Sequence, residues 1–103
     1  MKIYLDDVRP CPEGWTYCNW PSEVIELLKT EEVTHLSLDH DLGHDTITGK
    51  DVLKWLQEQV VTGEWKKELP EITIHSDNPE GIRAMRLIIE SIKRHNERRL
   101  RSS

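Results

Sequence analysis

The chain has 103 residues, of which 19 are acidic and 14 are basic, giving a formal net charge of -5 at pH 7. A chain of this length can bury a single core, which excludes a two-domain architecture, so we expect one domain over residues 1–103. Apolar residues make up only 36% of the chain, but Ile, Leu, Val and four Trp recur in blocks that disordered chains lack. No run approaches the ~20 apolar residues of a membrane helix. Residues 1–9 lack the apolar stretch of a signal peptide, so we expect a cytoplasmic protein that does not enter a membrane.

The charge is distributed unevenly along the chain. Residues 93–103 contain five basic residues and one acidic residue, a local charge of +4, so residues 1–92 carry 9 basic and 18 acidic residues, a charge of -9. Cations near a helix C-terminus complement the helix dipole, and we interpret residues 93–103 as the basic end of a C-terminal helix. The negative charge of residues 1–92 repels a phosphate backbone, so no strong binding of duplex nucleic acid is expected. Cys11 and Cys18 fit no zinc spacing and are expected to be free thiols.

The first half of the chain predicts three strands and one helix. Residues 3–5 form a short apolar run that ends in two aspartates, which indicates a buried strand followed by a loop. Residues 14–20 are rich in Trp, Tyr and Thr and indicate a second, weaker strand. Pro21 and Ser22 begin a helix that runs to about Glu31. Residues 33–38 predict the second clear strand.

The second half predicts two helices separated by one strand. Thr48, followed three residues later by an acid, resembles a capping box, and the apolar stripe that follows ends at Gly63. Residues 71–75 form a third clear strand, short and β-branched. Asn78 suits an N-cap with Pro79 at the first position of a long final helix. Strands that alternate with helices of this length predict an α/β domain with a mostly parallel sheet.

Polar side chains follow each of the three clear strands. In an open parallel sheet, ligands bind beyond the carboxyl ends of the strands, so these positions are the informative ones. The three groups are Asp6, Asp7 and Arg9; Asp39, His40 and Asp41; and His75, Ser76, Asp77 and Asn78. If the strands are parallel neighbours, the three groups converge on one edge of the sheet.

The carboxylates among these residues favour a divalent cation. Several carboxylates in one place repel each other, and a hard cation such as Mg²⁺ offsets this while keeping water that a phosphate can displace. We therefore expect Asp6, Asp7 and Asp39 to bind a divalent metal, Mg²⁺ in the first place and Mn²⁺ as the alternative. For any single aspartate, a turn or cap after a strand is the simpler interpretation, and the agreement of three strand ends favours the site.

Two histidines, His40 and His75, stand beside these carboxylates. A lone histidine is more often structural, but two at equivalent strand ends can divide the general base and general acid roles near neutral pH. Together with Asp39 and Asp41 they form the predicted catalytic group. A less favoured variant is a transition-metal site in which His40 joins the His-Asp pair at 44–45.

Ser76 and Asn78 precede the final helix, whose first N–H groups and positive dipole end suit a phosphate. Plain N-capping by Asn78 is an equally good interpretation and does not exclude the other. With Arg9, which would offset charge on phosphoryl oxygens, these are the predicted substrate-binding residues. Trp15 and Trp20 could wall the site and stack on a base, although core packing is the commoner role for Trp.

The pattern resembles the receiver superfamily of response regulators. In that comparison Asp6 and Asp7 match the acidic metal-binding pair, Asp39 the phospho-acceptor, and Ser76 the hydroxyl residue that contacts the phosphoryl group. The chain departs from it in having no fifth strand followed by the receiver lysine. The segment at 9–20 is also too rich in Pro and Gly for the usual first helix. Phospho-signalling is therefore the third-ranked hypothesis.

A closer resemblance is to the cyclic-phosphate-processing receiver domains. It is carried by residues 3–10 (IYLDDVRP), 12–15 (PEGW), 36–43 (LSLDHDLG), 49 (G) and 74–79 (IHSDNP). We expect a three-layer, receiver-like (flavodoxin-like) α/β domain with about four strands in the order 2-1-3-4. The resemblance implies a phosphoesterase that opens a cyclic phosphate of a nucleotide, ADP-ribose or RNA terminus during RNA repair, with help from a metal and the two histidines. The alternative is an inactive, degenerate receiver that binds metal or phosphate and acts through protein contacts.

Overall fold

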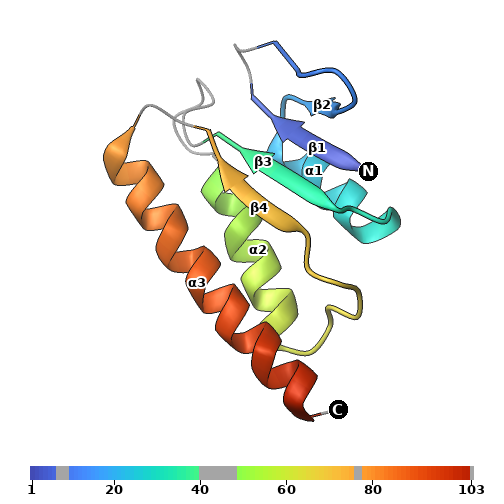
Figure 1. Ribbon diagram of the computed structural model, residues 1–103, viewed down its shortest axis with the longest axis vertical. Coiled ribbons are helices and arrows are strands. Elements are labelled where there is room, and N and C mark those ends of the chain that lie inside the picture. Colours follow the sequence, from blue (N-terminus) through green and yellow to red (C-terminus); the bar gives the residue numbers. More distant parts are fainter. Residues whose placement is uncertain (7–9, 40–48, 76–77, 103) are drawn as a thin grey trace.

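Four short strands pair in parallel in the order β2-β1-β3-β4, in a computed structural model (Figure 1). The structure describes residues 1–6, 10–39, 49–75 and 78–102. The elements are β1 (Lys2–Leu5), β2 (Thr16–Cys18), α1 (Pro21–Thr30), β3 (His35–Leu38), α2 (Gly49–Val61), β4 (Glu71–Ile74) and α3 (Pro79–Ser102). The predicted α/β receiver-like class and strand order are confirmed.

Local sequence signals account for where the helices begin and end. Pro21 opens α1, and the Glu23 carboxylate accepts a hydrogen bond from the backbone N–H of Trp20. The Asn78 side-chain oxygen accepts from the N–H groups of Glu80 and Gly81, at 3.1 Å each, so the predicted N-cap of α3 is confirmed. Gly63 follows α2 with a φ of +82°, a conformation that favours glycine.

The hydrophobic core lies between the sheet and all three helices. Ile3, Leu5, Leu36 and Leu38 point to this face and are fully buried. From the helices they are met by Val24, Leu28, Val52, Leu53, Leu56, Met85 and Ile92. In Figure 1, α1 and α2 lie behind the sheet and α3 runs beside α2. Among the described residues, one helical layer therefore covers one face.

The expected third layer is not formed by any described helix. The receivers that the chain resembles usually have a helix after the first strand. Here residues 10–15 form no helix, because Pro10, Pro12 and Gly14 interrupt the segment, and Gly14 has a φ of +86°. The second sheet face instead carries the alternate strand residues, of which Tyr4 and Ser37 are 8% and 7% exposed.

No helix in the described ranges is long and apolar enough to cross a bilayer. Cys11 and Cys18 are both free thiols, as the sequence predicted. Of the tryptophans, Trp65 is buried at 6% exposure and packs edge-on against Trp55 with ring centroids 6.4 Å apart. These two rings serve the core, which is the commoner role for Trp.

Candidate functional site

Three side chains from three different strands meet at the carboxyl edge of the sheet. Asp6 follows β1, Asp39 follows β3 and His75 follows β4. One ligand atom of each, a carboxylate oxygen or an imidazole nitrogen, lies within 4.8 Å of the corresponding atoms of the other two. Asp6 is fully buried, Asp39 is 7% exposed, and the His75 side chain is 18% exposed. We call these three residues the strand-end cluster.

The register of the sheet places the strand-end cluster. Leu5 pairs with Leu38, and Leu38 pairs with Ile74, so the next residue of each strand falls in line. The backbone N–H groups of Asp6, Asp39 and His75 donate to the carbonyls of Cys18, Leu5 and Leu38 at 3.2, 3.2 and 2.9 Å. The ladder thus continues one residue beyond the strands. The three side chains of the cluster therefore stand on backbone that is hydrogen-bonded into the sheet.

His75 is held on three sides. Its Nε2 atom lies 3.1 Å from Asp6 Oδ2, and its Nδ1 atom lies 2.6 Å from Ser37 Oγ. Its ring stacks on Tyr4 with centroids 4.3 Å apart and an interplanar angle of 2°. Trp15 packs edge-on against the same Tyr4 ring at 6.3 Å. These contacts fix both the position and the orientation of the imidazole.

Ser37 can hold His75 in either neutral tautomer. A hydroxyl both donates and accepts, so Ser37 can donate to Nδ1 while Nε2 carries the proton, 3.1 Å from Asp6 Oδ2 but not aligned for a hydrogen bond with it. It can equally accept from Nδ1–H, which leaves the Nε2 lone pair directed toward the carboxylates. The second arrangement is the one that lets Nε2 accept a proton or bind a cation.

The strand-end cluster fits a divalent cation. Buried carboxylates are costly unless a positive charge offsets them, and two of them share this edge with one imidazole. Neighbouring ligand atoms of an octahedral ion with bonds of ~2.1 Å lie about 3 Å apart, close to the Nε2–Oδ2 separation of 3.1 Å. Carboxylates suit Mg²⁺ and Mn²⁺, whereas an imidazole in the set favours Mn²⁺ or another transition metal over Mg²⁺.

The first residue of α2 packs directly against the backbone of the strand-end cluster. The Gly49 N–H donates to the Asp39 carbonyl at 3.0 Å. A Cβ atom at Gly49 would lie 2.2 Å from that same oxygen, so only glycine fits without a shift of the backbone. The residue that follows β3 is therefore tied to the start of α2.

Sequence reasoning found the three residues of the strand-end cluster but missed the two that position the histidine. Tyr4 and Ser37 lie within strands, two residues before Asp6 and Asp39. Residues two apart in a strand share a face, so the alternation was the signal that could have found them.

Several predicted site residues fall outside the described residues. They are Asp7, Arg9, His40, Asp41 and Ser76, and the same holds for Thr48 and for the alternative metal pair at 44–45. Asn78 is described, and its side chain caps α3. Trp20 lies two residues beyond β2, at the same edge of the sheet as Asp6, and is 41% exposed.

Comparison with known proteins bears on these features. The family model described as the cyclic-phosphate processing receiver domain matches residues 1–91. The chain belongs to this family. No curated protein and no solved structure matches the chain significantly. The match covers all four strands, α1, α2 and the first half of α3, so the whole strand-end cluster lies within this receiver-like domain.

Proposed function

We propose that this receiver-like domain hydrolyses a cyclic phosphodiester of a nucleotide, ADP-ribose or RNA terminus at the strand-end cluster. The observation that carries the proposal is the imidazole of His75, fixed by Ser37 and Tyr4 and in contact with Asp6. An aspartate that only accepts a phosphoryl group needs no such base beside it. Family membership supports the substrate class at the level of cyclic-phosphate processing.

The proposed reaction adds water across one P–O bond of the ring. Nε2 of His75 takes a proton from the attacking water, whose oxygen bonds to phosphorus, and the ring P–O bond to the ribose breaks. The leaving ribose oxygen takes a proton, for which His40 is the candidate donor from the sequence. Asp6 Oδ2, 3.1 Å from Nε2, stabilises the imidazolium that forms.

In this proposal Asp6 and Asp39 hold the divalent cation, Mn²⁺ or Mg²⁺, with Asp7 as a further ligand from the sequence. When bound, such a cation supplies charge that offsets the phosphoryl oxygens. Arg9 and Ser76 are the candidate contacts to those oxygens. Trp20, exposed at the same edge, is the candidate for stacking on a base.

The test is ring opening followed by ³¹P NMR. The protein is incubated with a 2′,3′-cyclic nucleotide, a cyclic phosphate of ADP-ribose and an RNA oligomer ending in a cyclic phosphate, each with Mg²⁺ and with Mn²⁺. We expect turnover that Asp39→Asn lowers at least 100-fold, while Glu58→Gln, an equal charge change on an exposed part of α2, leaves it within twofold. Cation and phosphate binding without turnover of any of the three would favour the binding module instead.

A further inference from the structure

The outer edge of β4 carries backbone groups that face away from the sheet. The N–H groups of Glu71 and His75 donate to Thr34 and Leu38 on the β3 side, at 2.9 Å each. Successive N–H and C=O groups of a strand point in opposite directions in the plane of the sheet. Those of Ile72 and Ile74 therefore point outward, and no described strand pairs with them.

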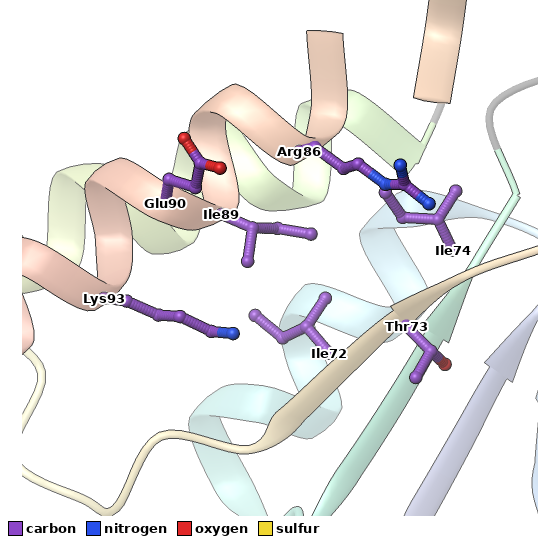
Figure 2. A pocket seen from close by; sticks show the side chains of 7 residues that line it. All are labelled: Ile72, Thr73, Ile74, Arg86, Ile89, Glu90 and Lys93. Carbon is purple, nitrogen blue, oxygen red and sulfur yellow. The ribbon is translucent and has the colours of Figure 1, made fainter. Parts of the chain in front are cut away.

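A groove of about 410 Å³ runs along this edge, between β4 and α3. Ile72 and Ile74 are partly buried, and their side chains point from β4 toward α3, whereas Thr73 points away (Figure 2). Ile89, 7% exposed, forms the apolar wall on α3. Outward backbone groups beside an apolar floor are what an added strand requires.

The rim of the groove carries two basic residues and one acidic residue, a net positive charge. Arg86, Glu90 and Lys93 are exposed on α3 and line the groove, with Arg86 near Ile74 and Lys93 near Ile72 (Figure 2). The two cations are seven residues apart, about 10 Å along a helix with a rise of 1.5 Å per residue. Alternate residues of a strand are about 6.6 Å apart, so acidic residues at alternate positions of a strand come within reach of both cations.

We propose that the groove between β4 and α3 binds an extended, acidic segment of a partner protein, which adds to the sheet beside β4. Its backbone would pair with Ile72 and Ile74. Its acidic side chains, which share one face of the strand, would reach across the isoleucine floor to Arg86 and Lys93, and its apolar side chains would lie on the opposite face. This binding site is separate from the strand-end cluster and does not depend on the proposed activity.

A second copy of the chain fits this groove poorly. In a symmetric dimer, the β4 edges of two copies would pair antiparallel about a two-fold axis. The two α3 helices would then lie side by side and run in opposite directions. Arg86 of one copy would then face Lys93 of the other, and the two Glu90 side chains would face each other. Like charges in direct opposition are destabilising. The charges therefore favour a partner of opposite sign.

Two labelled peptides test the proposal by fluorescence anisotropy. One is a capped seven-residue peptide in which Glu alternates with Val, and the other carries Lys in place of each Glu. We expect the acidic peptide to bind at least tenfold more tightly. Arg86→Glu combined with Lys93→Glu should weaken its binding at least tenfold, because both changed side chains line the groove. Arg94→Glu combined with Arg101→Glu, an equal charge change at exposed positions of α3 outside the groove lining, should leave it within twofold.

Amide hydrogen exchange of the unaltered protein separates strand addition from simple charge attraction. With the acidic peptide bound, exchange at the Ile72 and Ile74 amides should slow at least tenfold, while the amides of Glu71 and His75, already bonded to β3, should change little. Equal binding of both peptides, equal loss in the two charge-reversed variants, or unprotected Ile72 and Ile74 amides would each overturn the proposal.

Discussion

Ser37 determines how His75 is presented to the carboxylates. Its hydroxyl lies 2.6 Å from His75 Nδ1, on the side of the ring opposite the nitrogen that faces Asp6. Tyr4 fixes the plane of the same ring by parallel stacking. A loop residue could reorient on binding, but Ser37 and Tyr4 are strand residues with 7% and 8% exposure. The imidazole is therefore oriented before any ligand arrives.

We predict that Ser37→Ala lowers ring-opening activity by about 10- to 100-fold, the usual cost of losing a residue that orients a functional histidine. Ser37→Thr, which keeps the hydroxyl, should restore most of the activity. The ¹⁵N shifts of the His75 ring should agree between the native protein and Ser37→Thr, and should differ in Ser37→Ala, which loses the hydroxyl contact to Nδ1. Full activity of Ser37→Ala with unchanged shifts would remove Ser37 from the positioning role.

A second prediction separates the two roles open to His75. Calorimetric titration with Mn²⁺ should show binding that Asp6→Asn weakens at least tenfold, because a buried carboxylate ligand is lost. If His75 transfers a proton, His75→Gln leaves the Mn²⁺ affinity within threefold and removes turnover. If Nε2 instead binds the cation, His75→Gln weakens Mn²⁺ binding as much as Asp6→Asn does. Glu58→Gln is the matched control on an exposed surface.

Some residues of the candidate site were predictable from the sequence and others were not. Asp6, Asp39 and His75 were predictable because each comes directly after an apolar run, and parallel strands bring their carboxyl ends to one edge. Ser37 and Tyr4 were not predicted as site residues, because a serine or tyrosine inside a strand fits the usual alternation of side chains between the two faces of the sheet. Their importance depends on which strands are neighbours, and that is a property of the folded sheet.

The first residue of α2 makes a close contact with the backbone of the strand-end cluster. The Gly49 N–H bonds the Asp39 carbonyl at 3.0 Å, and the Cβ of any larger residue would come within 2.2 Å of that oxygen. Such an overlap must be relieved by moving either the helix or the Asp39 backbone. The position of α2 and the position of the Asp39 backbone therefore depend on each other through the contact at Gly49.

We predict that Gly49→Ala lowers the free energy of unfolding by about 1–3 kcal/mol, the usual cost of overpacking, and also weakens Mn²⁺ binding because Asp39 moves. Gly63→Ala is the matched control at the other end of α2. Its φ of +82° also disfavours alanine, but a Cβ there would meet nothing within 4 Å. Urea unfolding should show a loss in both variants. Calorimetry should show weakened Mn²⁺ binding only in Gly49→Ala, and equal Mn²⁺ affinity in the two would contradict the coupling.

For the whole domain, the fold class and the order of the strands were predictable from the sequence. The placement of the helices on only one face of the sheet was not. Alternating strands and helices predict parallel pairing, and the order β2-β1-β3-β4 was expected for a receiver-like chain. Which face of the sheet the helices cover depends on which connecting segments form a helix and which do not. Proline and glycine in residues 9–20 argue against the usual first helix, but the consequence for the second sheet face becomes visible only in the assembled sheet.

The buried thiol of Cys18 makes the stability of the folded domain depend on pH. The thiol ends β2 and is 2% exposed, and burial, followed by the charges of Glu23 and Cys11, raises its pKa from 9.0 to about 11. Between these two values the unfolded chain releases the proton while the folded domain keeps it. Cys18 therefore contributes stability that is fully present below pH 9 and is lost as pH rises toward about 11.

We accordingly predict that the urea midpoint falls from pH 8.5 to pH 10.5 more steeply in the native protein than in Cys18→Ala, which lacks the thiol. The difference between the two slopes should correspond to a loss on the order of 2 kcal/mol. Other groups titrate in this range, but they are common to both proteins and cancel in the comparison. Parallel slopes would mean that the Cys18 thiol ionises as readily in the folded sheet as in the unfolded chain, against its burial between β1 and the helical layer.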